Sequence, residues 1–164
     1  MKNLAILLLV SVLIVSCNSN DDNNNDESFY YLNRHIEFKV TSIDGVDLLN
    51  SNNSNAYTEN NIKIFNLIDN EVVEVFNQEA ENPIDFRIVS PEDSGNEKYF
   101  IRVFINNSQL ENAITYIEWN DTDTDTIKSN SVANGNSLVL TQAWYNNELI
   151  IDENTETLPE IIKN

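Results

Sequence analysis

Several residue types that build common active sites are scarce in this chain of 164 residues. It contains one cysteine and one histidine, which is too few for a zinc site and excludes a disulfide within the chain. The histidine, His35, falls on the polar side of a predicted strand, and no Gly-x-Ser-x-Gly motif is present. Serine and cysteine hydrolases need a histidine beside a nucleophile. The sequence therefore predicts no enzymatic activity and no cofactor.

Positive charge is also scarce. Nine Lys and Arg residues stand against 27 Asp and Glu residues, which gives a formal net charge of −18. Such a surface repels phosphate backbones, so we expect no nucleic-acid partner. Glycine and proline occur only three times each. We therefore expect the abundant asparagine and aspartate residues to occupy the turns, because both tolerate left-handed backbone angles.

The one long apolar run lies at the start of the chain. A basic residue is followed by the run 4–15, apolar except for Ser11, and then by Ser16-Cys17, a pattern typical of a secretory signal peptide. As a helix this run would span about 18 Å, which is short of the roughly 30 Å of bilayer hydrocarbon. Ile14-Val15-Ser16-Cys17 resembles the bacterial lipobox. That resemblance implies removal of residues 1–16 and a lipid on Cys17.

Residues 17–31 are predicted to form a disordered acidic tether behind the lipidated cysteine, because the Asn/Asp-rich stretch 18–27 contains no apolar residue. Asp21-Asp22 resembles the acidic export signal of surface-displayed Bacteroidota lipoproteins, although it begins a few positions later than in that pattern. We therefore expect an outer-membrane lipoprotein that reaches the cell surface and contacts the membrane through its lipid.

Period-two alternation begins at residue 35, where Ile36, Phe38 and Val40 share one face. This pattern is typical of a half-buried antiparallel strand. Short strands separated by turns follow, with no convincing amphipathic helix. The sequence predicts an all-β, immunoglobulin-like or transthyretin-like antiparallel β-sandwich of about 7–9 strands over residues 32–152, with a barrel as the main alternative.

Individual elements can be predicted within that range. Asp69-Asn70 and Asn146-Asn147 are expected to close two-residue hairpins. Residues 98–106 are apolar on both faces, which indicates a central strand. Residues 126–128 read as a weak edge strand. The tail, 153–164, is expected to lie outside the sandwich, with a helical turn at 158–162.

Aromatic side chains are the candidate ligand-binding residues, because rings stack on the apolar faces of sugars. Trp119, Trp144, Tyr145 and Tyr116 lie on two predicted strands. Since each strand alternates between two faces, some of the four must belong to the core. The prediction that at least one tryptophan forms a ligand platform fails if both indoles are buried.

Acidic residues offer two weaker hypotheses. Asp121, Asp123 and Asp125 repeat the first ligand spacing of an EF-hand, but the loop lacks the glycine and the final glutamate of that motif. The three aspartates are therefore weak Ca²⁺ candidates, with a solvated acidic loop as the alternative. Glu118 is the best candidate for a catalytic acid of a glycosidase pair. Its alternation opposite Trp119 favours an exposed carboxylate instead.

Thr126 is a weak candidate for glycosylation. The tripeptide Asp125-Thr126-Ile127 resembles the Asp-Thr-aliphatic acceptor of periplasmic O-glycosylation in Bacteroidota. A glycan on the Thr126 hydroxyl is what that resemblance implies.

Several fragments resemble a family of small uncharacterised Bacteroidota outer-membrane lipoproteins, built from a lipobox and a single β-sandwich domain. These fragments are residues 44–50, 61–68, 116–119 with 123–127, and 144–149. The family brings no established activity or binding residues to transfer. Asn147 stands where the glycine of an Asn-Gly hairpin is expected.

These observations predict a non-catalytic binding module at the cell surface, with a glycan or a protein as its ligand. The alternatives are a structural or accessory subunit of an envelope complex and, as the weakest hypothesis, a hydrolase with two converging acids. An exposed Trp or Tyr patch would favour the binding module. An unpaired apolar edge strand would favour the envelope subunit.

Overall fold

The computed structural model describes residues 31–76, 84–135 and 137–164. The predicted signal peptide at 1–16, the lipid on Cys17 and the acidic pair Asp21-Asp22 lie outside the described residues. They stay predictions.

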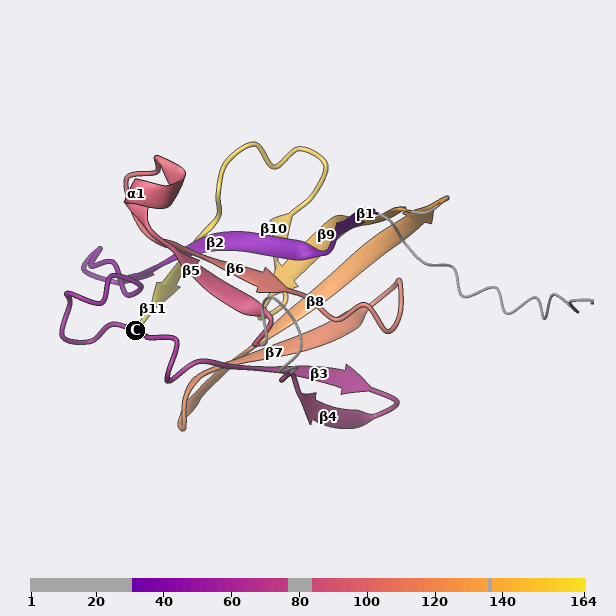
Figure 1. Ribbon diagram of the computed structural model, residues 1–164, viewed down its shortest axis with the longest axis horizontal. Helices are drawn as coiled ribbons and strands as arrows, with labels where there is room; N and C mark the ends of the chain where they lie inside the picture. Colours follow the sequence, from indigo (N-terminus) through magenta and orange to yellow (C-terminus); the bar gives the residue numbers. More distant parts are fainter. Residues whose placement is uncertain (1–30, 77–83, 136) are drawn as a thin grey trace, which may run out of the picture.

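Two β-sheets pack against each other around one apolar core (Figure 1). The large sheet has the strand order β1-β9-β8-β7-β3-β4, and β10 also pairs with β9. The small sheet has the order β11-β2-β6-β5. This architecture confirms the prediction of an all-β sandwich.

The large sheet consists of β1 (Tyr31–Asn33), β3 (Lys63–Ile68), β4 (Glu71–Glu74), β7 (Ala113–Asn120), β8 (Asp123–Asn134), β9 (Ser137–Tyr145) and β10 (Glu148–Ile151). The small sheet consists of β2 (His35–Ser42), β5 (Phe86–Val89), β6 (Phe100–Phe104) and β11 (Glu160–Lys163).

The strand count and one detail of the pairing differ from the prediction. The described residues form eleven strands, where seven to nine were expected. The sandwich is also not wholly antiparallel, because β1 pairs with β9 and β11 pairs with β2 in parallel. β1 pairs with part of β9, and β11 pairs with the side of β2 that faces away from β6. The chain passes from the large to the small sheet at Arg34, between β1 and β2.

Both predicted two-residue hairpins are confirmed. Asp69 and Asn70 join β3 to β4 with φ angles of 52° and 67°. Asn146 and Asn147 join β9 to β10 with φ angles of 47° and 72°. Left-handed backbone at both turn positions matches the twist of the flanking strands. Asparagine therefore serves at position 147, where glycine was expected.

Two predicted elements are wrong. Residues 126–128 are not an edge strand, since β8 runs for 12 residues between β7 and β9 in the middle of the large sheet. Two of its inward residues, Asp125 and Ser129, are polar. The alternation of apolar and polar residues therefore does not reveal that the strand is buried. Residues 158–162 form no helical turn. The end of the predicted tail instead forms β11, whose two isoleucines suit a strand.

Among residues 31–76, 84–135 and 137–164, helix is confined to one short segment. α1 (Pro91–Ser94) follows β5, and the side chain of Ser90 caps its start by accepting a hydrogen bond from the Asp93 amide. Gly95 ends it with a left-handed φ of 73°. Within the described part of the chain, no helix is long and apolar enough to cross a membrane.

Aromatic rings connect the two sheets across the core. Phe38 of β2 is fully buried and meets Trp119 of β7 edge-on, with ring centroids 6.5 Å apart. The same ring lies 5.5 Å from that of Tyr145 on β9. β6 lies between β2 and β5, as the two-faced apolar run predicted, and Ile101 is fully buried on its inner side.

Replacing Phe38 with alanine should remove the ring that joins both sheets. We expect Phe38→Ala to lower the free energy of unfolding by about 3–5 kcal/mol, the usual cost of deleting a buried aromatic ring. Ile43→Ala is the control, because Ile43 is 73% exposed and should cost less than about 0.5 kcal/mol. Urea denaturation measures both variants, and equal losses would contradict this description of the core.

Candidate functional site

The structure separates the four candidate aromatic residues into two pairs. Trp119 is 0% and Tyr145 is 5% exposed, because both point into the core. The expectation that these two contact a ligand is therefore wrong. Tyr116 and Trp144 occupy the opposite side of the same strands and are half-buried. The tryptophan platform remains available through Trp144 alone.

Tyr116 and Trp144 lie on the outer side of the large sheet. Tyr116 is directly opposite Phe65 on β3 and Thr126 on β8. Trp144 is directly opposite Lys128 on β8. We call the outward side chains of Phe65, Tyr116 and Trp144 the aromatic face, and all three are half-buried.

Charged side chains interleave with the aromatic face. The Nζ atom of Lys128 lies 4.2 Å from the centroid of the Trp144 ring, a cation–π contact. Lys63 pairs with Glu118 at 3.0 Å in the row next to Tyr116. Glu118 therefore carries an exposed ion pair rather than a buried catalytic acid.

The acidic segment Asp121 to Asp125 does not form a line of three carboxylates. Asp121 is exposed in the turn between β7 and β8, whereas Asp123 and Asp125 belong to β8 and point to the same side. The ammonium group of Lys163 contacts both of these carboxylates. No group of three or more potential metal ligands occurs among the described residues. The three-aspartate Ca²⁺ arrangement is therefore wrong.

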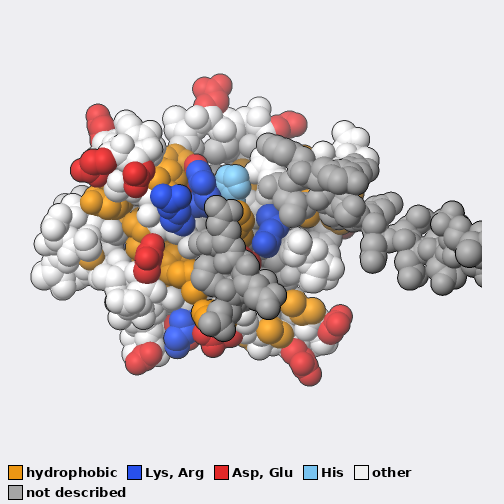
Figure 2. Space-filling model, in the orientation of Figure 1, with side chains coloured by type: hydrophobic (Ala, Val, Ile, Leu, Met, Phe, Trp, Pro, Cys, Tyr) orange, Lys and Arg blue, Asp and Glu red, His pale blue; other side chains and the backbone are white. Residues whose placement is uncertain are grey.

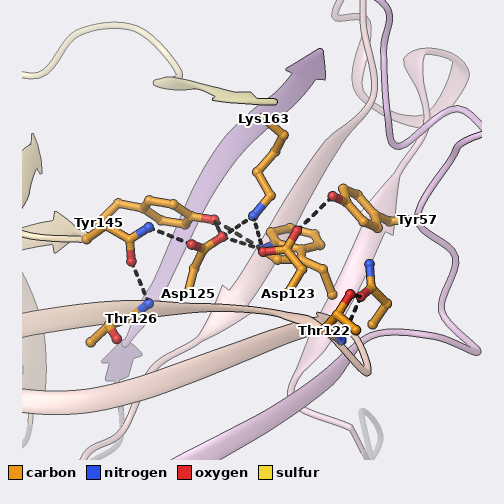
Figure 3. Close-up of polar contacts among 10 residues, drawn as sticks. Tyr57, Thr122, Asp123, Asp125, Thr126, Tyr145 and Lys163 are labelled. Atoms are coloured by element: carbon orange, nitrogen blue, oxygen red, sulfur yellow. Dashed lines mark hydrogen bonds and ion pairs between the residues drawn. The ribbon is translucent and has the colours of Figure 1, made fainter. Parts of the chain in front are cut away.

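Asp125 is the centre of a buried polar cluster (Figure 3). The residue is 7% exposed, and its carboxylate accepts a hydrogen bond from Trp119 Nε1 at 2.8 Å. It also accepts hydrogen bonds from the Tyr145 hydroxyl, from Lys163 Nζ and, at 2.5 Å, from Asn146 Nδ2. The alternative of a solvated acidic loop is therefore wrong for Asp125.

Asp123 completes this cluster on its outer side. Its Oδ1 atom lies 2.7 Å from Lys163 Nζ, and its Oδ2 atom accepts a hydrogen bond of 3.0 Å from the Tyr57 hydroxyl. The Tyr57 ring lies 4.8 Å from that of Trp119. We call these residues the Asp125 cluster: Tyr57, Trp119, Asp123, Asp125, Tyr145, Asn146 and Lys163.

The Asp125 cluster sets two carboxylates against one ammonium group, and neutral donors stabilise the buried carboxylate. Burial acts to raise the pKa of Asp125, but the hydrogen bonds from Lys163, Tyr145 and Asn146 outweigh burial and hold that pKa below its usual value. Burial and the hydrogen bond to Asp125 raise the pKa of Tyr145. Burial and the bond to Asp123 likewise raise the pKa of Tyr57. Both phenols therefore stay protonated as donors at neutral pH.

The Asp125 cluster borders a polar hollow of about 530 Å³. Residues from the β7–β8 turn and the end of the chain line it, including Asn120, Thr122 and Asn164. The hollow has hydroxyl, amide and carboxylate groups at its wall. The strongest of these groups already bind one another, so the hollow presents few free partners to a ligand.

Sequence reasoning missed Lys163 and Tyr57. Lys163 ends a short stretch that was assigned to a tail, although the alternation in Glu160-Ile161-Ile162-Lys163 is a usable strand signal. Tyr57 lies in a long polar loop where no periodicity marks it. The contact of both residues with β8 depends on tertiary pairing.

Thr126, the glycosylation candidate, is half-buried on the outer side of β8. Its backbone amide donates a hydrogen bond of 2.9 Å to Asn146 Oδ1. The glycan on its hydroxyl stays a prediction.

Basic side chains gather on the outer side of the small sheet, around the histidine (Figure 2). Arg102 of β6 is directly opposite Arg87 of β5, and it pairs with Glu37 at 2.5 Å. Burial, followed by the charge of Arg102, lowers the pKa of His35, while Glu37 acts in the opposite direction. His35 therefore lies beside an ion pair and not beside a nucleophile.

Comparisons with protein-family models, with curated proteins and with solved structures give no match for this chain. The resemblance to Bacteroidota lipoproteins therefore stays a prediction, and the functional argument depends on sequence and geometry.

Removing the cation of the Asp125 cluster should destabilise the fold strongly. We expect Lys163→Ala to lower the free energy of unfolding by about 3–5 kcal/mol, because it leaves a buried carboxylate without its partner. Lys98→Ala is a matched control, since Lys98 forms an exposed ion pair at 2.9 Å with Glu160, which lies on β11 as Lys163 does. That change should cost about 0–1 kcal/mol. Similar losses in chemical denaturation would show that Lys163 is an ordinary surface lysine.

Proposed function

We propose that this chain is a non-catalytic glycan-binding module held at the cell surface by a lipid on Cys17. The observation that carries the proposal is the aromatic face, where Phe65, Tyr116 and Trp144 project half-exposed from the outer side of the large sheet. Rings on an outer sheet face are the kind of surface on which sugar-binding modules stack their ligands.

The spacing of these rings suits a carbohydrate chain. Phe65 and Tyr116 lie on adjacent strands, which are about 4.8 Å apart in a sheet. Trp144 lies two strands beyond Tyr116 across β8. Rings in this arrangement can stack on the apolar faces of successive sugar units, while Lys63 and Glu118 offer hydrogen bonds to hydroxyl groups. Lys128 has a flexible stem and can move off the Trp144 ring when a sugar stacks there.

The predicted anchor supports a position at the surface. A stretch of ten residues can extend about 35 Å, so residues 18–27 would hold the sandwich clear of the headgroups. The charge of −18 keeps such a domain away from anionic membrane surfaces. A tethered domain of this kind meets ligands outside the cell.

The state of the acids supports a non-catalytic role. A glycosidase needs one acid with a raised pKa near a second carboxylate. Among the described acids, Glu118, Glu37 and Asp125 are each bound to a cation. Burial raises the pKa of Asp85, and this carboxylate also pairs with a cation, Arg34, at 3.5 Å.

Binding to a glycan array tests the proposed ligand class. We expect Trp144→Ala and Tyr116→Ala each to weaken binding about tenfold, because an aromatic contact contributes on the order of 1 kcal/mol beyond its buried area. Phe104→Ala is the matched control, since Phe104 lies on the outer side of the small sheet, opposite His35. Binding that is unchanged by the first two variants, or no binding to any glycan, would contradict the proposal.

Protease shaving of intact cells tests the proposed location. The wild-type domain should be removed by added protease. Changing Asp21 and Asp22 to alanine should protect it, because the acidic signal for surface export is lost. Protection of both forms would place the domain in the periplasm and contradict surface display.

A second candidate, an accessory subunit of an envelope complex, is favoured by the edge of the large sheet. Among the strands that the structure describes, β4 is the outermost on its side of that sheet. Val72 and Val73 of β4 are 59% and 43% exposed. Exposed apolar edges are the usual place for strand addition by a partner protein. For an accessory subunit, Val73→Lys should prevent assembly with the partner, seen as loss of the slower band on a native gel, and should leave glycan binding unchanged.

A further inference from the structure

The amine of Lys163 is in direct contact with the carboxyl group of Asp125. Its side chain is 11% exposed and that of Asp125 is 9% exposed, and Nζ contacts Asp125 Oδ2 directly. The two residues come from opposite sheets, Lys163 from β11 and Asp125 from β8. The Trp119 ring lies beneath the ammonium group, with its centroid 5.6 Å from Nζ. An amine and a carboxyl group are thus held in contact, both largely buried, beside an aromatic ring.

We propose that Lys163 Nζ condenses with the side-chain carboxyl group of Asp125 and forms an amide cross-link between the two sheets. Fixed contact between two reacting groups replaces a bimolecular encounter and provides effective concentrations of about 10⁵–10⁸ M. Burial adds a second driving force, because an amide replaces two buried charges whose desolvation is costly.

Asp123 is placed to move the protons that this reaction requires. Its Oδ1 atom lies 2.7 Å from Lys163 Nζ, so it can accept a proton from the ammonium group and leave a nucleophilic amine. Asp123 is 31% exposed at its side chain and lines the same polar hollow as Asp125, through which the proton can reach the leaving oxygen.

Trp119 and Tyr145 are placed to stabilise the intermediate. Both donate hydrogen bonds to Asp125 Oδ2, the oxygen that would carry negative charge after attack on the carboxyl carbon. Preorganised donors of this kind are the main source of stabilisation in acyl transfer. The other oxygen, Oδ1, is bound by Asn146 Nδ2 and leaves as water.

The atoms and charges of the reaction balance without a co-reactant. One C–N bond forms and one C–O bond breaks. The ammonium group gives up two protons, which leave with one carboxylate oxygen as a water molecule. One positive and one negative charge disappear together, so the net charge is unchanged. The adjacent polar hollow offers the water an exit.

Asp125 is a better acceptor than Asn146. Asn146 is exposed, and its Oδ1 atom already accepts a hydrogen bond from the Thr126 amide. Asp125 is buried and contacts Nζ directly. A cross-link to Asn146 would release ammonia rather than water, so the two possible cross-linked products differ in mass.

Mass spectrometry of a tryptic digest of the denatured full chain tests the cross-link. Asp125 lies in tryptic peptide 103–128, and Lys163 ends peptide 129–163. Trypsin does not cut at an acylated lysine, so the cross-linked chain yields one branched species of 103–128 and 129–164, lighter than their sum by one water. Fragment ions must place the branch on Asp125.

Lys163→Arg is the matched variant, because it keeps the cation and cannot form this amide. Its two peptides should appear separately. Asp123→Asn should lower the cross-linked fraction of a freshly folded sample, since it removes the proton acceptor and leaves both reacting groups in place. Separate wild-type peptides after prolonged incubation of the folded chain at neutral pH would overturn the proposal. A loss of ammonia within peptide 129–164 would also overturn it.

Discussion

The contact between Lys163 and Asp125 is the interaction on which the rest of this structure depends. A carboxylate inside an apolar core is costly unless a cation and several donors compensate it. Here the cation arrives on the last strand of one sheet and the carboxylate on a middle strand of the other. Burying Asp125 therefore requires the parallel addition of β11 to β2. The segment Glu160–Lys163 is thus a structural part of the sandwich.

The same strands connect this contact to the aromatic face. Trp119 and Tyr145 point inward to Asp125, and their near neighbours Tyr116 and Trp144 point outward. Because side chains alternate along a strand, fixing the inner residues also fixes the outer ones. A binding surface built on such strands keeps its ring spacing without a ligand. In the proposed glycan site, such rigidity would lower the conformational entropy that the protein itself loses on binding.

Local sequence signals predicted the sandwich and both tight hairpins, because alternation and turn chemistry depend on near neighbours. They failed for β8, where Asp125 and Ser129 occupy inward positions that usually hold apolar residues. They failed also for β11, a strand of four residues that exists only through its pairing with β2. The polar cluster could not be predicted, since Tyr57 and Lys163 contact β8 from distant parts of the chain.

A double-mutant cycle tests the central claim most directly. Asp125→Leu leaves the Lys163 ammonium group and the other donors without their acceptor, and Lys163→Met leaves the Asp125 carboxylate without its cation. The double variant removes both charges and fills the space with apolar atoms. The free energies of unfolding should show a coupling of about 2 kcal/mol or more, with the double variant recovering much of the single losses. Losses that add to within about 0.5 kcal/mol would contradict the claim that this contact holds the two sheets together.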